Sequence, residues 1–339
     1  MSDQHRRNLI TDVEGVLVGN AGDDVLCSGV TAVVLARPAA ASCAVLGGAA
    51  ATRDTHALEP DAVVEAIDAI VLSGGSGFGL DAASGAQAWL REQERGFAVG
   101  PARVPIVPSA ICFDLLNGGD KAWGRYPPYR ELGYQAAVAA GTGFALGSVG
   151  AGLGATTVSL RGGLGSASAT TRDGHTVGAL AVVNALGSAV IGAGPHFWAA
   201  PLEEGGELGG LGWPSRIAPR DRALAWKGGR SPATTLAVVA TDAALSKAGL
   251  KRLAIAAHDG FARALRPAHA LFDGDTIFAV STGARPLGSD AAADRIEIGA
   301  VAADCVARAI ARGVYEAAPA SGTYTGPPAW RERFPPGSP

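Results

Sequence analysis

Residues 233–242 read ATTLAVVATD, and the character of the chain changes within this stretch. Leu236 to Ala240 form a short apolar run rich in Val, which is typical of a buried strand. The segment before it, 192–232, is rich in Gly, Pro and charged residues and has no helical or strand period. It is also longer than most connections in compact domains. The sequence therefore predicts a flexible loop, 192–232, that runs directly into a core strand.

Two threonines, Thr234 and Thr235, occupy the junction between the loop and the strand. A hydroxyl residue placed here suits an N-terminal nucleophile: the chain is cut just before it, and the freed α-amine becomes the base for the same residue. The amine suits this role because its ordinary pKa of about 7.7–8.0 is close to neutrality. Thr is also common in ordinary strands. The pair alone leaves both interpretations open and does not decide which Thr follows the cut.

The composition of the whole chain sets limits on its class. Of 339 residues, 48% are hydrophobic and 17% are charged, which predicts a well-packed chain with little disorder. The net charge of −3 gives no electrostatic case for nucleic acid or an anionic membrane as a partner. The N-terminus has no apolar signal core and no stretch resembles a spanning helix. We expect a cytoplasmic protein of the α/β or α+β class.

Apolar patterns outward from this stretch predict the remaining elements. Strands are expected at 16–18, 29–36, 45–50, 69–72, 104–107, 110–113, 175–192 and 276–281, and helices at 61–66, from residue 80, 129–140, 247–265 and 295–311. The tail from residue 318 is rich in Pro, and we expect it to be poorly ordered.

Several other motifs offer alternative functional sites. Gly77, Gly79 and Ala82 match a dinucleotide-binding G-x-G-x-x-A motif between a strand and a helix. No acidic residue follows at the end of a second strand, so these glycines fit turns and close packing better. A nucleotide-binding enzyme remains an alternative, which predicts saturable binding of NAD or ATP. The four cysteines and six histidines show no metal-ligand spacing, and we expect no metal or cofactor.

Asp273 and Asp275 lie at the mouth of the strand expected at 276–281. Carboxylates spaced i, i+2 point the same way if the segment is extended. They could bind a metal or hold an ammonium group, although Asp-Gly-Asp is also common in solvated turns. Beside a candidate N-terminal Thr, a functional role for the two carboxylates is favoured, because a freed α-amine needs anionic partners to orient it.

With these motifs assembled, the chain resembles the P1 peptidase family of autocleaving aminopeptidases, which includes L-aminopeptidase/D-esterases, β-aminopeptidases and nylon-oligomer hydrolases. The resemblance runs from about Asn8 to Ala311. It rests on the ordered motifs LITDVEGVLVGNA (9–21), SGVTAVVL (28–35), GGAAATRDTHALEP (47–60), DAIVLSGGSGFGLDAASG (68–85), VPIVPSAICFDL (104–115), GSVGAGLGAT (147–156), GGLGSASA (162–169), TVGALAVVNALG (176–187), TTLAVVATDA (234–243) and FDGDTIFAVSTG (272–283).

The resemblance implies an α+β fold, a four-layer αββα sandwich like that of N-terminal-nucleophile hydrolases. Its connectivity is distinct from theirs and shared with ornithine acetyltransferase. It further implies one hydrolase domain, 1–317, followed by the Pro-rich tail, 318–339. The precursor is expected to cut itself into an α chain, 1–233, and a β chain, 234–339. Relatives form tetramers, so a homotetramer is expected.

The same resemblance implies roles for four residues. Thr234 matches the nucleophile, and Asn184 matches the Asn whose amide helps to form the oxyanion hole. Asp273 and Asp275 match the pair that orients the amine of the nucleophile and relays protons. The implied reaction is hydrolysis of small peptides or related amides through an acyl-enzyme.

Three positions depart from the family pattern. Ala233 stands where the nylon-hydrolase branch has Asn, and Phe113 where many relatives have an active-site Tyr. The segment 154–162 has no Lys, and its one cation, Arg161, cannot serve as a base. These departures motivate an alternative function, a catalytically silent homologue that acts as a binding or scaffold protein. The substrate and the exact oligomer stay open at this stage.

Overall fold

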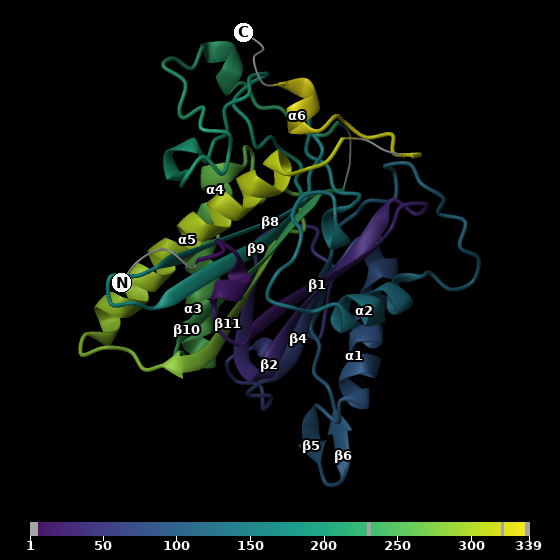
Figure 1. The fold of residues 1–339 in the computed structure, drawn as a ribbon, viewed down its shortest axis with the longest axis vertical. Helices are drawn as coiled ribbons and strands as arrows, with labels where there is room; N and C mark the ends of the chain where they lie inside the picture. Colours follow the sequence, from purple (N-terminus) through teal and green to yellow (C-terminus); the bar gives the residue numbers. More distant parts are fainter. Residues whose placement is uncertain (1–5, 229–231, 320–321, 336–339) are drawn as a thin grey trace.

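The computed structural model describes residues 6–228, 232–319 and 322–335. Eight of the nine strands of the main sheet form a path with the order β3-β7-β4-β2-β11-β10-β9-β8, and the ninth, β1, pairs with β2. A separate hairpin, β5-β6, projects from the body (Figure 1). The strands are β1 (Val16–Asp23), β2 (Ser28–Val45), β3 (Thr52–Arg53), β4 (Ile67–Ser73), β5 (Phe97–Val99), β6 (Ala102–Val104), β7 (Ser109–Ile111), β8 (Leu164–Thr170), β9 (Thr176–Asn184), β10 (Thr234–Ala243) and β11 (Thr276–Arg285). The helices are α1 (Ala82–Glu92), α2 (Tyr129–Val138), α3 (Lys247–Ala257), α4 (Asp259–Ala264), α5 (Ala291–Tyr315) and α6 (Trp330–Arg333).

Strand β2 carries the path from one sheet layer into the other. Its first part pairs with β1 and β4, and residues 40–45 pair with β11. Because side chains alternate along a strand, Val33 and Leu35 enter a core between the two layers, whereas Val34 faces helices α1 and α2. The same inner core takes Leu236 and Phe278 from the second layer. The two halves of the path therefore pack face to face.

Three buried apolar clusters separate four layers. One lies between α1, α2 and the first sheet layer, and the second lies between the sheets. The third joins the β8-β9-β10-β11 layer to α3, α4 and α5, and takes Ala237 and Val239 from the other face of β10. The helices thus cover both outer faces, as Figure 1 shows. The predicted αββα sandwich is confirmed. No helix in the described ranges is long and apolar enough to cross a bilayer.

Strand β10 is fully buried and lies between β9, antiparallel, and β11, parallel. In this register Thr234 lies opposite Asn184, and Ala233 forms a bridge with Asp273. Three segments that are far apart in sequence therefore meet at one end of the β9-β10-β11 layer. This geometry positions the site described below.

Two predicted helices differ from the structure. Residues 61–66 form turns and irregular chain, because Lys247 Nζ of α3 donates hydrogen bonds to the carbonyl oxygens of Ala62 and Val64. A helix there would need such carbonyls for its own bonds. The expected helix 247–265 is two helices, α3 and α4, joined at His258, whose side chain bonds the carbonyl of Ala44. The strand pattern expected at 45–50 ends at Val45.

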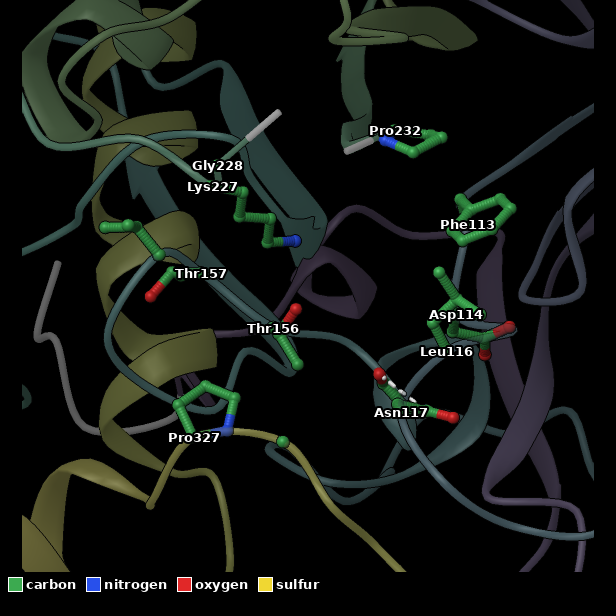
Figure 2. Close-up of a pocket in the computed structure, with 13 residues that line it drawn as sticks. Phe113, Asp114, Leu116, Asn117, Thr156, Thr157, Lys227, Gly228, Pro232 and Pro327 are labelled. Carbon is green, nitrogen blue, oxygen red and sulfur yellow. Dashed lines mark hydrogen bonds between the residues drawn. The ribbon is translucent and has the colours of Figure 1, made fainter. Parts of the chain in front are cut away.

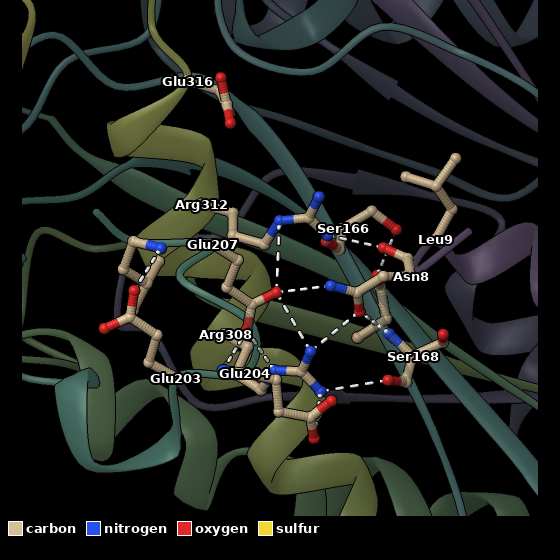
Figure 3. A network of polar contacts seen from close by, with 12 residues as sticks. Asn8, Leu9, Ser166, Ser168, Glu203, Glu204, Glu207, Arg308, Arg312 and Glu316 are labelled. Carbon is tan, nitrogen blue, oxygen red and sulfur yellow. Dashed lines mark hydrogen bonds and ion pairs between the residues drawn. The ribbon is translucent and has the colours of Figure 1, made fainter. Parts of the chain in front are cut away.

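The segment 192–232 has little regular structure, with short 3₁₀ turns at Ala200–Leu202 and Pro219–Arg222. Its first part is tied to α5 by a buried set of polar side chains, Asn8, Glu207, Arg308 and Arg312, which we call the Glu207 network (Figure 3). Arg308 Nε lies 2.5 Å from Glu207 Oε1, and Asn8 Nδ2 lies 2.5 Å from Glu207 Oε2. Residues 209–211 and 222–226 are exposed.

The Pro-rich tail was expected to be poorly ordered, and its described part, 322–335, is instead packed. Trp330 is buried, stacks on Phe197 and donates from its indole nitrogen to the carbonyl of Pro195. Tyr324 lies over the guanidinium of Arg161. The tail therefore covers part of the fold through its aromatic side chains. All four cysteines are buried and free.

Candidate active site

Thr234 is the first residue of β10 and is 3% exposed. Its Oγ1 lies 2.5 Å from the carbonyl oxygen of Ala233, and the same oxygen accepts a hydrogen bond of 2.9 Å from the Gly274 N–H. The Ala233 N–H donates to the carbonyl of Phe272 at 3.0 Å. The Ala233–Thr234 peptide is therefore clamped beside residues 272–274, with a hydroxyl beside its carbonyl.

The space around residue 274 accommodates a glycine but not a larger side chain. A Cβ on Gly274 would lie 2.6 Å from Thr234 Oγ1, closer than real Cβ contacts come. The glycine between the two aspartates thus lets the chain approach the hydroxyl, and its N–H reaches the carbonyl of Ala233.

The carboxylates of Asp273 and Asp275 are buried and accept hydrogen bonds from backbone N–H groups of the segments that meet at Thr234. Asp275 Oδ1 accepts from the Thr235 N–H at 2.9 Å, and its Oδ2 accepts from His269 at 2.8 Å. Asp273 accepts from the N–H groups of Leu186 and Ala270, each at 3.1 Å. Both residues named from the sequence are therefore at the site.

The two aspartates also affect each other. Burial, and then the negative charge of Asp275, raise the pKa of Asp273 to about 6, against hydrogen bonds from Leu186 and Ala270 that favour the carboxylate. Asp273 therefore changes protonation near neutral pH, which is common for groups at functional sites.

Asn184 lies at the end of β9, and the oxygen of its side-chain amide, Oδ1, has two donors beside it. Oδ1 accepts from the Thr156 N–H at 3.0 Å and lies 3.3 Å from Lys227 Nζ. Nδ2 donates to the carbonyl of Phe113 at 2.8 Å. An amide nitrogen carries two hydrogens, so one N–H of Asn184 stays available for an oxygen that gains negative charge.

Lys227 is the site residue that sequence reasoning missed. Its side chain reaches into the pocket shown in Figure 2. Burial lowers its pKa to about 8, although the nearby Cys112 and Asp273 act in the opposite direction. Nothing in the local pattern WKGG signals this role, because its contacts lie some distance away in sequence. Arg161, the one cation of segment 154–162, binds the carbonyl oxygens of Ala318 and Pro319 in the tail.

The pocket has a volume of about 350 Å³, within the usual range for small-molecule sites. It is lined by Phe113, Asp114, Leu116, Asn117, Gly154, Thr156, Thr157, Val158, Lys227, Gly228, Pro232, Gly326 and Pro327. The Asp114 carboxylate is bound internally, by Ser28 Oγ at 2.6 Å and the Gly75 N–H at 2.7 Å. Gly75 belongs to the glycine cluster that was weighed as a nucleotide motif. There a Cβ on Gly79 would lie 1.8 Å from the carbonyl of Gly74, which supports a close-packing role.

Within the described residues, no group of three or more His, Cys, Asp or Glu side chains could hold a metal ion. The site is instead a hydroxyl, its neighbouring peptide, N–H donors, two carboxylates and one amine. These are the components of acyl transfer, with a nucleophile, oxyanion donors and groups that exchange protons.

Comparison with known proteins identifies the family of the chain. The model of peptidase family S58 matches residues 8–326. A curated relative described as an uncharacterized aminopeptidase from Mycobacterium tuberculosis H37Rv is 42% identical, over 97% of this chain and 98% of its own length. A second one, from Mycobacterium leprae, is 39% identical and covers 94% of each chain.

Solved structures share the fold. A β-aminopeptidase from a Burkholderia species superposes with a TM-score of 0.71 at 23% identity, covering 97% of this chain and 93% of its own. The L-aminopeptidase D-Ala-esterase/amidase from Ochrobactrum anthropi, described as a variant of the Ntn hydrolase fold, has a TM-score of 0.64 at 22% identity, over 93% and 88%. The chain therefore belongs to peptidase family S58, as the P1-family motifs predict, and is a hydrolase of peptide or amide bonds.

Proposed function

We propose that the protein is an autoprocessing aminopeptidase whose nucleophile is Thr234, released by cleavage after Ala233. The observation that carries the proposal is the contact between Thr234 Oγ1 and the carbonyl of Ala233, 2.5 Å apart, on a carbonyl that also accepts from Gly274. A hydroxyl next to a polarised carbonyl suits an N-to-O acyl shift.

The shift proceeds by attack of Thr234 Oγ1 on the carbonyl carbon of Ala233. The new C–O bond forms, the C–N bond of the peptide breaks, and the hydroxyl proton passes to the nitrogen. Water then hydrolyses the ester and leaves a carboxylate on Ala233 and a free amine on Thr234. The Gly274 N–H supports the negative charge that develops on the oxygen.

After cleavage the free amine of Thr234 acts as the base for the hydroxyl beside it. Asp275 holds the N–H of Thr235, Asp273 lies beside Ala233, and the two carboxylates supply the negative charge that orients this amine. The spare N–H of Asn184, which lies opposite Thr234 in the β9-β10 register, donates to the oxyanion both in the cut and in hydrolysis of the substrate. The substrate enters the pocket as the N-terminal end of a small peptide or a related amide, and water releases the acyl-enzyme.

The test is to incubate the purified chain and to follow it by denaturing electrophoresis, intact mass and N-terminal sequencing. We expect fragments 1–233 and 234–339, and hydrolysis of aminoacyl p-nitroanilides by the cut form. Thr234→Ala stays whole and inactive, whereas Thr234→Ser keeps the hydroxyl and is cut. A wild-type chain that remains whole and inactive contradicts the proposal and agrees with a binding or scaffold protein.

The proposal also includes a homotetramer in the cytoplasm. Light scattering during size-exclusion chromatography measures the oligomer directly, and fractionation of the source cells tests the location. A mass of one chain in solution contradicts the oligomer without affecting the chemistry.

A further inference from the structure

We propose that Lys227 is a positioning residue that fixes the Asn184 amide in its oxyanion-binding orientation during autocleavage and hydrolysis. The inference rests on the proposed function. It names a residue of the loop before the cut as part of the site that performs the cut.

The orientation follows from the donors around Asn184. An Asn side chain can turn over, which exchanges its oxygen and its nitrogen. The Lys227 ammonium and the Thr156 N–H are both donors without acceptor capacity. They lie 3.3 and 3.0 Å from Oδ1 of Asn184, so the oxygen must face them. The opposite end must then be the nitrogen, which agrees with its bond to the carbonyl of Phe113.

Lys227 is itself held by the chain beside the site. Its N–H donates to the carbonyl of Leu186 at 3.0 Å, and the N–H of Leu186 donates to Asp273. Its Nζ also lies 3.4 Å from the carbonyl of Asn184. The loop is therefore anchored where it passes Asn184.

The surroundings allow the lysine to act on Asn184 instead of pairing with an acid. No carboxylate of the described residues lies within ion-pair distance of Lys227 Nζ. The titratable groups around it are Asp273, Cys112 and the pocket residue Asp114. Burial raises the pKa of the Cys112 thiol well above its usual value, and burial raises that of Asp114 as well.

The fall in the rate of autocleavage at alkaline pH distinguishes this role of Lys227 from the titration of other groups. The pKa of Lys227 is lowered to about 8, mainly by burial, so the ammonium is lost in mildly alkaline solution. The uncut chain has no α-amine at Thr234 that could titrate in the same range. Loss of the charge weakens the bond to Oδ1 and slows the cut.

The first experiment follows autocleavage of freshly synthesised full-length chain from pH 6 to 10. Lys227→Met should slow the cut roughly ten- to hundredfold at pH 7, since small misplacements at a site have effects of this size. Lys227→Arg should restore most of the rate and remove the fall near pH 8, because Arg stays charged. Lys251→Met, which removes a surface lysine paired with Glu59, is the matched control. In the cut forms, kcat should fall by a larger factor than KM changes.

The second experiment does not need cleavage. The asparagines of the chain are Asn8, Asn20, Asn117 and Asn184, so Asn-selective ¹⁵N labelling of a Thr234→Ala chain gives a simple side-chain amide spectrum. The Asn184 pair should shift with a midpoint near pH 8, and this shift should vanish in Lys227→Met. The Asn20 pair serves as the internal reference.

The outcomes separate the two proposals. A wild-type rate for Lys227→Met, or an Arg variant as slow as the Met variant at an unchanged melting temperature, overturns the positioning role. An Asn184 amide that does not respond to Lys227 overturns it too. If the Asn184 amide titrates with Lys227 but the wild-type chain is never cut, the orientation is supported and autoprocessing fails.

Discussion

The Glu207 network and the Thr234 site both hold charged side chains that are largely out of solvent, and the pKa values of their carboxyl groups Glu207 and Asp273 shift in opposite directions. In the network, burial acts to raise the pKa of Glu207, but hydrogen bonds from Arg308 and Asn8 hold it below its usual value. At the site, the pKa of Asp273 is raised and that of Lys227 is lowered.

The difference distinguishes a set of charges that holds the fold together from a set that exchanges protons. Groups in the network are paired so that each stays charged over the whole neutral range, which suits a fixed connection. Groups at the site are poised near the pH of the solution and are able to exchange protons. Burial alone is thus a poor guide to function, and the balance of partners decides it.

The largest effect is expected from breaking the network. Arg308→Met leaves the carboxylate of Glu207 buried without its main partner, and the loss of one partner of a buried pair costs about 3–5 kcal/mol. The matched control is Arg263→Met, because Arg263 pairs with Asp304 at the surface, where a pair contributes about 0–1 kcal/mol. Urea unfolding measures both.

Activity per folded molecule should be unchanged in both variants. Equal stabilities for the two variants, or a loss of kcat in Arg308→Met without a loss of stability, would show that the comparison is wrong.

The next effect is a loss of rate at the site. Asn184→Ala removes the amide donor, and loss of one oxyanion donor lowers kcat by about 10²–10³. Asn8→Ala removes an amide from the network instead, and should lower the melting temperature with kcat intact. Steady-state kinetics with thermal unfolding distinguish the two. A normal kcat in Asn184→Ala removes this residue from the mechanism.

A smaller effect is expected from Gly274→Ala, because the added methyl group would press on Thr234 Oγ1. Overpacking typically costs about 1–3 kcal/mol, so autocleavage should slow by roughly tenfold or more. In Gly249→Ala of α3 the added carbon has its nearest neighbour at 3.5 Å, so this variant should be cut at the normal rate. The rate at which fragment 234–339 appears measures cleavage in both variants. Equal rates would show that residue 274 does not approach Thr234 Oγ1 closely.

The last effect is a pH dependence of stability that follows from the raised pKa of Asp273. Since the pKa of Asp273 is raised from 3.8 to about 6, the folded chain holds a proton that the unfolded chain has lost between these values. The contribution of Asp273 is therefore greatest below about pH 4 and is lost as the pH rises through 6. In a Thr234→Ala background, Asp273→Asn should remove this slope. An unchanged slope assigns the titration to other groups.

Local sequence was sufficient for most of the core. The LAVVA run predicts β10, and the apolar periods predict β4, α1 and α2, because these elements bury faces that their own residues define. The helix expected at 61–66 is wrong for a reason outside that segment, the bonds from Lys247. The packing of the tail likewise depends on Phe197, a distant partner of Trp330.

The residues of the site likewise differ in whether local sequence is sufficient to find them. Asp273 and Asp275 could be named from i, i+2 spacing at a strand mouth. Asn184 needed the family motif, since only the β9-β10 register places it opposite Thr234. Lys227 could not be found, because its contact with Asn184 depends on how an irregular loop returns to the site.

The burial of Thr234 has a consequence for how the protein can be made. Chain ends usually lie at the surface, whereas the proposed cut creates a new chain end inside a sheet, where the residue is 3% exposed. Such an end has no space for an initiator methionine or a tag, so a β chain translated separately would fit only after those residues are removed. Self-cleavage of a single polypeptide avoids this step, because Thr234 is already seated in the sheet when its amine is released.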